Sequence, residues 1–463
     1  MNKKWLQKSA CILLTVCMVQ VCTSCNKTKN TSSTNVKIAG GFKIYRLESD
    51  RVMEDSLWKF RVIYPNIVID DNVIKDSTEF SDKMNTELMA GEGPDVIKAD
   101  ASIFNSFHKT MNSGIFYDIS SFMENDNDFI PSSYNKTILD SGIVDGKQLY
   151  IPISYKVPCI WTAKSIWNET GVSFNKAEWT WQQLLDTGKN FIKNSQSGEK
   201  RYIFSDLYSA YESLKKDFDY YEKSHYDAFH GLLLSGGMEF VDYEKKQSHF
   251  NSPPFIALLE TLKELNTHST PNEVLKSYKK NFYGQLEEKS LLAVCDDTGD
   301  TLRPSVLSSN NSFIRNYLNN EMILYPFPTY SEGDKVMAEP LSIAAVNSNS
   351  KNKEAGYHFI RILLSLDIQE EINMGIPVSN IAIDEMMATN YGILLENNTK
   401  DQLPAELAEQ AKEIMKNIDG CEIMDQGVLT FVQESVDSFI KGDITAKQAA
   451  EMIDNKVMLF LSE

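Results

Sequence analysis

Short apolar runs and helical patterns alternate along the first part of the sequence. A strand is predicted at residues 36–39, and Met53, Leu57 and Phe60 then recur at the spacing of one helical face. Pro65 ends this helix, because proline lacks the amide hydrogen that the next helical turn needs. An apolar strand is therefore followed by an amphipathic helix.

The same order recurs directly afterwards. A second strand is predicted at residues 67–69, and Phe80, Met84 and Leu88 define one face of a second helix. A glycine-rich break ends that helix, and a third strand begins at residues 95–97. Strands that alternate with helices indicate βαβ units, so the fold class is α/β with a largely parallel sheet.

The rest of the chain is mainly helical but returns to strand character several times. Thr180 with Gln183, and Thr445 with Gln448, have the spacing of a helix capping box. Gly442 is placed to end the helix that precedes Thr445. Four later apolar segments are predicted strands: 151–161, 291–295, 322–325 and 341–346.

The amino-terminal residues have a different pattern. Three lysines precede an apolar run at residues 10–21, which is too short to span a membrane comfortably. The small residues Thr23 and Ser24 then come directly before Cys25, and a polar stretch follows. This order is typical of an export signal.

The segment resembles a bacterial lipoprotein signal, in which the cysteine after the cleavage point becomes acylated. Cys22 stands where that signal usually has leucine. The resemblance implies removal of residues 1–24, lipidation of Cys25 and a flexible tether at 25–35 that holds the protein on the outer side of the bacterial membrane. An ordinary signal peptide or a short membrane anchor is the alternative.

Charge and cysteine content narrow the class of protein. The formal charge is −18, and loss of the three amino-terminal lysines makes it −21, which argues against nucleic acid and against charge-driven binding to anionic lipid. The length suggests at least two lobes. Cys159, Cys295 and Cys421 are widely spaced, so we expect no disulfide framework.

Catalytic signatures are scarce in the sequence. None of the six histidines forms an i, i+4 pair, no nucleotide or hydrolase motif occurs, and we expect neither a metal nor a cofactor. Asp296 and Asp297 follow a predicted strand, where open α/β sheets hold their ligands. Adjacent carboxylates at a strand end usually point in different directions, which makes ligand contact more plausible than catalysis.

Several stretches, in order, resemble the extracellular solute-binding proteins of ABC transporters, in the group that includes maltose-binding protein. They are spread over nearly the whole chain after the signal. The stretches are "FRVIYPNIVID", "MNTELMAGEGPDVIKAD", "DGKQLYIPISY", "WTWQQLL" and "FIKGDITAKQAAEMI".

The resemblance implies two α/β lobes of the type II periplasmic-binding-protein fold, which close by a hinge over a ligand in the cleft between them. It implies that both lobes are discontinuous along the chain. The amino-terminal lobe would comprise residues 36–153 and 327–374, and the carboxy-terminal lobe residues 154–326 and 375–463.

The resemblance also places solute contacts at strand ends and at the crossing segments. No tryptophan follows the first strand or the strand before Asp296, where the family often carries a stacking ring. Trp161 is a substitute, or else part of the strand core. The proposed contacts are Tyr45, Arg46, Asp100, Tyr155, Trp161, Asp296, Asp297 and Glu339.

The function that follows from the resemblance is capture of a solute, with a carbohydrate as the default, and delivery to a membrane permease. A monomer without catalytic activity is expected. The acidic candidates also suit a cationic solute or a basic peptide. A sensory binding lobe and an extracellular carbohydrate-cleaving enzyme are further alternatives, the last requiring two facing carboxylates.

Overall fold

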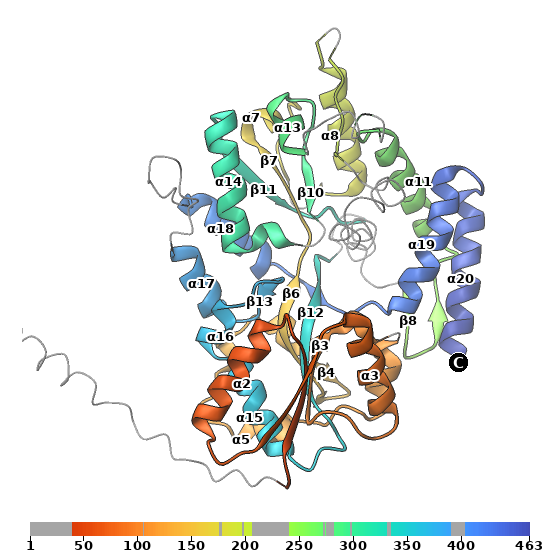
Figure 1. Ribbon diagram of the computed structural model, residues 1–463. Helices are drawn as coiled ribbons and strands as arrows, with labels where there is room; N and C mark the ends of the chain where they lie inside the picture. The colour runs from red at the N-terminus through yellow and green to blue at the C-terminus, as the bar shows by residue number, and fades with distance from the viewer. Residues whose placement is uncertain are drawn as a thin grey trace, which may run out of the picture. The chain divides into compact units, whose positions relative to one another are not determined.

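The computed structural model describes residues 39–463 apart from short gaps (Figure 1). Cys25, Asp297 and most of the strand predicted at residues 36–39 lie outside the described residues. The residues left out within the described range are 105, 176–177, 197–198, 206–239, 272–273, 275–281, 297–298, 331–334 and 390–402.

In the described part of the chain, the larger sheet has seven strands in the order β13-β6-β12-β3-β1-β2, with β14 paired to β12. β1, β2 and β3 are parallel to one another, which confirms the predicted βαβ start. β12 is antiparallel to β3 and β6, and β13 is antiparallel to β6, so the sheet is mixed and not largely parallel as predicted. The strands are β1 (Phe42–Leu47), β2 (Ile69–Ile74), β3 (Val96–Asp100), β6 (Ile151–Lys156), β12 (Met337–Val346), β13 (Ile376–Pro377) and β14 (Gly420–Cys421).

The first strand of the described residues is β1, which was not predicted as a strand; the strand predicted at residues 36–39 lies mostly outside the described residues. Two basic residues, Lys43 and Arg46, interrupt the apolar pattern of β1. Both are held in ion pairs, with Glu87 and Asp71 respectively, at N–O distances of 3.2 and 3.0 Å. Because paired charges are tolerated in a half-buried strand, β1 contains polar positions that the apolar pattern alone does not reveal.

Helices α2 (Arg51–Ile63) and α15 (Lys353–Leu363) cover one face of the larger sheet. The Phe60 ring of α2 stacks on Phe42 of β1 with 5.0 Å between centroids, and meets Phe359 of α15 edge-on at 5.5 Å. The buried side of α2 is the side that its apolar spacing predicts.

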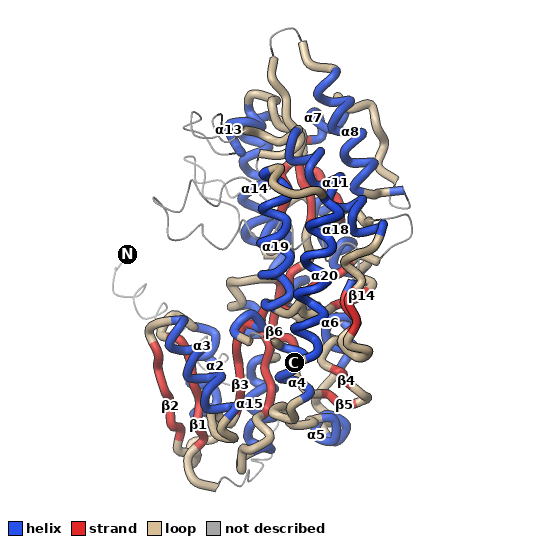
Figure 2. Tube along the Cα trace, turned by 90° about the vertical axis from the view of Figure 1, so that its right-hand side faces the viewer, coloured by secondary structure: helices blue, strands red, loops and turns tan. Residues whose placement is uncertain are grey.

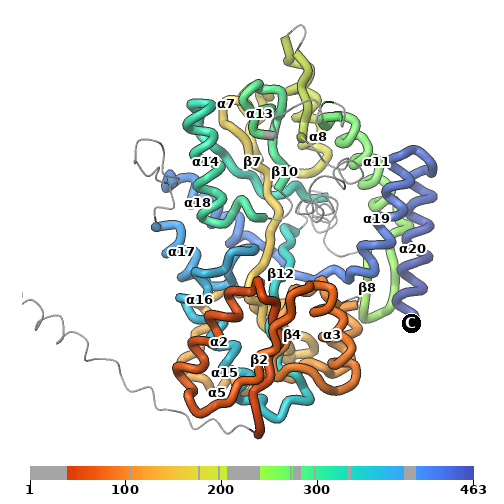
Figure 3. Tube along the Cα trace, viewed as in Figure 1, coloured from red at the N-terminus to blue at the C-terminus, as the bar shows by residue number. Residues whose placement is uncertain are grey.

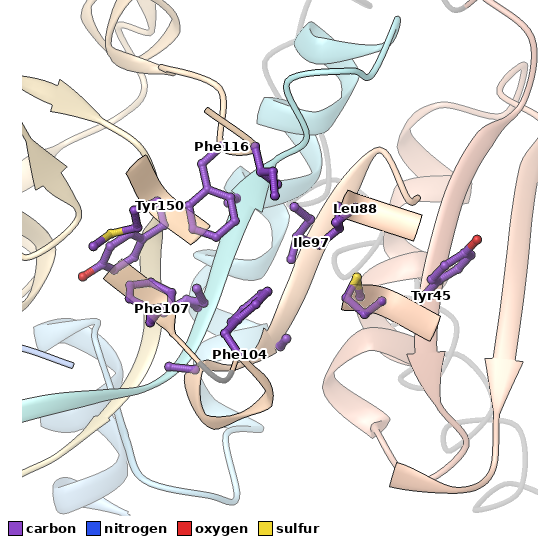
Figure 4. Packing of buried hydrophobic residues seen from close by; sticks show 14 of the residues in the cluster. Tyr45, Leu88, Ile97, Phe104, Phe107, Phe116 and Tyr150 are labelled. Atoms are coloured by element: carbon purple, nitrogen blue, oxygen red, sulfur yellow. The ribbon is translucent and has the colours of Figure 1, made fainter. Parts of the chain in front are cut away.

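Helices α3 (Ser77–Met89) and α4 (Phe107–Asn112) cover the opposite face. Their apolar side chains and those of the sheet form one buried cluster (Figure 4). The cluster fixes the position of α4 against the sheet, which matters below because α4 also contacts more distant parts of the chain. Its labelled members are Tyr45, Leu88, Ile97, Phe104, Phe107, Phe116 and Tyr150.

Asp126 follows α5 (Ser120–Asn125) and joins it to α15. Its carboxylate accepts hydrogen bonds from the Tyr357 hydroxyl and the Arg361 Nε, each 2.8 Å long. Burial by itself would raise the pKa of Asp126, but these two donors more than offset it, and the pKa lies below its ordinary value. Asp126 therefore stabilises the fold at neutral pH.

We expect Asp126→Asn to lower the free energy of unfolding at pH 7 by about 1–2 kcal/mol, because it weakens two charge-assisted hydrogen bonds. The contribution of a carboxyl group with a lowered pKa is complete above its ordinary value of about 4 and is lost as the pH falls through the folded-state pKa. Urea unfolding at pH 7 and pH 3 measures this. The difference in free energy of unfolding between Asp126→Asn and the parent should be smaller at pH 3 than at pH 7. Asp128→Asn, at an exposed position, serves as control.

The smaller sheet has three strands in the described part of the chain, in the order β10-β7-β11, all antiparallel. They confirm the strands predicted within residues 151–161 and at residues 322–325, while the strand predicted at 291–295 begins later. The strands are β7 (Cys159–Ala163), β10 (Val294–Asp296) and β11 (Met322–Pro326).

Helix α8 (Trp181–Lys193) begins at the predicted capping residue, Thr180, whose side chain accepts from the Gln183 amide at 3.2 Å. Only this half of the predicted capping box is found, and Gln183 Nε2 donates to the Glu178 carboxylate at 3.4 Å. Trp179 and Trp181 are both buried, which confirms that they are structural.

The carboxy-terminal helices α19 (Gln426–Lys441) and α20 (Ala446–Ser462) form an antiparallel pair next to α11 (Pro253–Thr267) (Figure 2). Gly442 ends α19 with φ +85°, and the complete capping box of Thr445 starts α20, as predicted.

The remaining elements connect and cover these two sheets. None of the helices in the described part of the chain is long and apolar enough to cross a membrane. They are α6 (Lys136–Asp140), α7 (Lys164–Asn168), α13 (Phe282–Glu287), α14 (Pro304–Leu318), α16 (Leu366–Glu370), α17 (Asn380–Ala388) and α18 (Ala405–Lys416), with the hairpins β4 (Ile143–Val144) to β5 (Lys147–Gln148) and β8 (Val241–Asp242) to β9 (Gln247–Ser248).

Candidate functional site

The chain passes repeatedly between the two sheets. β6 of the larger sheet is separated from β7 of the smaller sheet by Val157 and Pro158 alone (Figure 3). The chain returns from β11 to β12, and after β13 it leaves the larger sheet again for α18, which packs on β11. Such crossing segments are the elements that a hinge between two lobes requires.

A buried ion pair joins two of these crossing strands. Lys156 at the end of β6 lies opposite Glu339 of β12, and their Nζ and Oε2 atoms are 2.9 Å apart. Both side chains are almost inaccessible to solvent. The other carboxylate oxygen accepts from the Met424 amide at 3.4 Å. Glu339, proposed from the sequence as a solute contact, therefore has structural partners within the protein.

Tyr155 is a fully buried residue of β6, between Pro340 of β12 and Ile376 of β13. Its position in a crossing strand agrees with the sequence analysis. Burial raises the pKa of its hydroxyl group, and the Asn135 side chain only partly opposes this. No hydrogen bond of normal geometry is formed by that hydroxyl group within the described residues.

Asp296 shapes the loop that follows β10. Its carboxylate accepts hydrogen bonds from the amides of Gly299 and Thr301, at 3.1 and 2.6 Å. Gly299 adopts φ +70°, and a Cβ atom there would lie 2.6 Å from the Val157 carbonyl oxygen. The loop thus packs against the backbone that links β6 to β7, where only glycine fits. Asp296 holds the loop in place.

Arg303, which follows this loop, attaches it to the segment that precedes β13. Arg303 pairs with Asp300 at 3.1 Å, and its guanidinium also donates to the carbonyl oxygen of Asn373. Gly375, with φ +73°, lies against the Tyr155 carbonyl, 2.8 Å from where its Cβ would be. The sequence analysis missed these residues; glycines next to predicted strand ends were the available signal.

Tyr45 and Arg46 lie within β1 rather than after the first strand. The Tyr45 hydroxyl donates to Glu87 of α3, and burial together with this carboxylate raises its pKa to about 12. Arg46 Nε donates to Asp71 of β2 at 3.0 Å. Both side chains therefore join elements of the larger sheet and its covering helix.

Asp100 is the last residue of β3, at the edge of the sheet where the parallel strands end. Its side chain accepts from the Ser102 amide at 3.0 Å and so starts the short helix η1 (Ala101–Ile103). Nearby on β3, Lys98 pairs with Asp50 at 2.7 Å, and Asp50 caps α2. Asp100 stays in the strand-end position that the sequence predicts.

Trp161 occupies the centre of the smaller sheet, between Val294 of β10 and Leu324 of β11. Only 1% of the residue is exposed, and its ring lies 6.3 Å from that of Tyr283. Of the two roles considered for Trp161, this burial favours the strand core.

A second set of contacts between distant segments was not predicted. The His108 ring of α4 stacks on Tyr243, just after β8, with 3.5 Å between centroids and 8° between planes. His108 Nδ1 is 3.2 Å from a carboxylate oxygen of Asp425, and the Ser106 hydroxyl donates to the other at 2.9 Å. Burial, followed by the Asp425 charge, raises the pKa of Tyr243. No single stretch of sequence contains these partners, which explains why pattern reading missed them.

Beside this contact lies a groove of about 800 Å³. Its lining residues come from α4, β4, β8, β12 and β14 and from the segments next to them. Its polar lining residues include His108, Asp145, Tyr243, His249, Lys335 and Glu422.

Asp297 and Cys25 lie outside the described residues, so their proposed roles stay predictions. Among the described residues, no group of three or more histidine, cysteine, aspartate or glutamate side chains has the arrangement of a metal site. The geometry of the described residues is that of two sheets joined by buried crossing strands and by loops packed against them.

Comparison with known proteins agrees with this geometry. The sugar-binding protein MalE of the phytopathogen Xanthomonas citri superimposes with a TM-score of 0.66 at 13% identity, covering 91% of this chain and 97% of that one. The ABC substrate-binding protein Lmo0181 of Listeria monocytogenes, in complex with cycloalternan, gives 0.59 at 15% identity, with 91% and 99% covered. Maltose-bound MalE3 of T. maritima gives 0.58 at 17% identity, with the same shares covered. No protein of curated function matches the sequence.

These structures and the two connected sheets define the two-lobe fold of the periplasmic binding proteins. The family model for bacterial extracellular solute-binding proteins matches residues 52–266. This match covers somewhat less than half of the chain, and the likeness to the solved structures shows the fold.

Proposed function

We propose that the protein is lipid-anchored through Cys25 on the outer side of the bacterial membrane, captures an oligosaccharide and delivers it to the permease of an ABC transporter. The observation that carries this proposal is the two-lobe fold, with crossing strands between its sheets, in a chain whose residues 52–266 match the family model of extracellular solute-binding proteins. Structural neighbours bound to cycloalternan and maltose support a carbohydrate as the ligand class.

The mechanism is closure of the two lobes about the crossing segments. We propose that the lobes comprise residues 36–153 with 327–374, and 154–326 with 375–463. A solute bound between them favours the closed form by its additional contacts with the second lobe. The permease then recognises that form.

The eight proposed solute contacts fall into three groups according to the partners and the burial of their side chains. Asp100 and Asp297, at or near strand ends, are the solute contacts that we retain. Asp296 and Glu339 have partners that favour a role in positioning the crossing segments. Burial favours structural roles for Tyr45, Tyr155 and Trp161, and the ion pair with Asp71 favours one for Arg46.

A thermal-shift screen of residues 26–463 tests the proposed ligand class. A solute that binds the native state raises the melting temperature. We expect a rise with one class of oligosaccharide, including maltose-like sugars in the panel, and no cleavage products after incubation. A rise only with amines or basic peptides would instead support a cationic solute, and released sugar products would identify an enzyme.

We expect Asp297→Asn to weaken solute binding about 10–100-fold, because a hydrogen bond to a charged group contributes about 1.5–3 kcal/mol. Calorimetric titration with the solute found in the screen measures this. Asp443→Asn, at the exposed turn between α19 and α20, is the matched control and should bind as the parent does. Equal affinity of parent and Asp297→Asn would remove Asp297 from the site.

A further inference from the structure

Four exposed apolar side chains gather at one edge of the larger sheet. β1, β2 and β3 run in parallel and start at the same edge, and α2 and α3 each return the chain to it. We call the exposed residues at this edge the apolar rim. The rim consists of Val62 (60% exposed) and Ile63 (48%) at the end of α2, Val68 (72%) before β2, and Met89 (77%) at the end of α3.

The amino-terminal segment enters the fold at the same edge. The Ala39 amide donates to the Asn352 side chain at 2.8 Å, and Phe42 at the start of β1 donates to the carbonyl oxygen of Val68 at 2.8 Å. Asn352 also binds Asp95 just before β3, at 3.2 Å. The point where the chain leaves the lobe is therefore fixed beside the rim.

Chain length then limits how far this edge can lie from the membrane. Thirteen residues separate Cys25 from Ala39, and a fully extended chain of that length reaches at most about 45 Å. A short link of this kind gives the rim a high local concentration of lipid, so even a weak apolar contact becomes populated.

We infer that the apolar rim rests on the outer surface of the lipid bilayer to which Cys25 is anchored. This inference rests on the lipid anchor in the proposed function. The contact is apolar and not charge-driven, since the chain without its three amino-terminal lysines carries a net charge of −21, three below the −18 of the full chain, and would be repelled by anionic lipid. It orients the amino-terminal lobe with its strand-start edge on the membrane and leaves its strand-end edge, where Asp100 lies, directed away.

The chain carries a natural probe for this contact. Trp58 is 66% exposed on α2, one turn before Val62, whereas Trp161, Trp167, Trp179 and Trp181 are all buried. A quencher in the lipid phase should therefore act on Trp58, and the difference from Trp58→Phe isolates its signal.

The experiment uses residues 25–463 with Cys295→Ser, coupled through Cys25 to a maleimide phospholipid in phosphatidylcholine vesicles with brominated acyl chains. Cys159 and Cys421 are buried, so coupling is directed to Cys25. We expect at least a twofold loss of the Trp58 emission compared with non-brominated vesicles. Partial replacement of phosphatidylcholine by phosphatidylglycerol should reduce this loss.

Substitutions at the rim make the test specific. Val68→Asp combined with Met89→Asp should restore the emission, while Val73→Asp, near the opposite end of β2, should not. Thermal melting checks that these variants fold. Unquenched Trp58 in vesicle-bound protein, or equal quenching in the rim variant, would overturn the inference. A loss of Trp58 emission that depends on the density of protein on the vesicles, and not on the brominated lipid, would also overturn the inference. It would indicate a second copy of the chain at the rim.

Two further measurements separate this inference from the proposed anchor. Vesicle flotation shows that the coupled protein is on the membrane whatever the rim does. Mass spectrometry of the chain isolated from bacterial membranes shows whether Cys25 is acylated in the cell. Acylated Cys25 with unquenched Trp58 would contradict the rim contact alone, and unmodified Cys25 would contradict the anchor.

Discussion

Replacement of Glu339 by alanine is expected to lower the free energy of unfolding by about 3–5 kcal/mol. Glu339 Oε2 and Lys156 Nζ are 2.9 Å apart in two adjacent crossing strands; the Glu339 side chain is buried, and that of Lys156 is only 12% exposed. Loss of Glu339 removes the carboxylate that lies opposite this ammonium group at a site with little solvent exposure, which accounts for the size of the effect.

Urea unfolding at pH 7 measures this effect, and two variants make it interpretable. Glu434→Ala removes the partner of Lys456 in an exposed pair of similar length and should cost less than about 1 kcal/mol. Lys156→Met with Glu339→Leu removes both charges together and should recover most of the lost stability. A Glu339→Ala variant as stable as Glu434→Ala would contradict a structural role for the buried pair.

The second large effect is expected at Gly299. Alanine there should lower the free energy of unfolding by about 3 kcal/mol, for two reasons that add. A residue with a Cβ atom is disfavoured by about 1–2 kcal/mol in the left-handed region. The new Cβ would also lie 2.6 Å from the carbonyl oxygen and 2.8 Å from the amide nitrogen of Val157, so the backbone of a crossing segment would have to move.

The variant Gly442→Ala separates the cost of the left-handed backbone conformation from the cost of the contact with Val157. Gly442 also has a positive φ, +85°, but an added Cβ would meet no atom within 4 Å. The control should therefore show only the backbone term of about 1–2 kcal/mol. If urea unfolding gave the same loss of free energy of unfolding for the two variants, the added Cβ at position 299 would cause no steric destabilisation against Val157.

Much of the fold was predictable because it depends on local patterns. The apolar faces of α2 and α3, the glycine that ends α19 and the capping box before α20 all depend on residues within a few positions of each other. β1 was not predicted as a strand, because its basic residues are stabilised by Glu87 and Asp71, which are distant in sequence.

The site was less predictable, because contacts from distant segments decide what each side chain does. Tyr45 follows the pattern of a strand-end residue in the sequence, yet it donates to α3. Asp296 resembles a ligand contact but holds a turn against Val157, and the stack of His108 on Tyr243 joins residues more than a hundred positions apart. The expectation that ligands bind at the carboxyl ends of strands identifies an edge of the sheet, but it does not identify the partner of each side chain.

The central claim is that the protein binds a solute between two lobes that close on it. Small-angle X-ray scattering of residues 26–463, with and without the solute identified by thermal shift, tests it most directly. The account predicts a smaller radius of gyration in the saturated protein, with no change when a non-binding sugar is added. An unchanged radius of gyration, in the presence of saturating solute whose binding calorimetry confirms, would contradict closure as the mechanism.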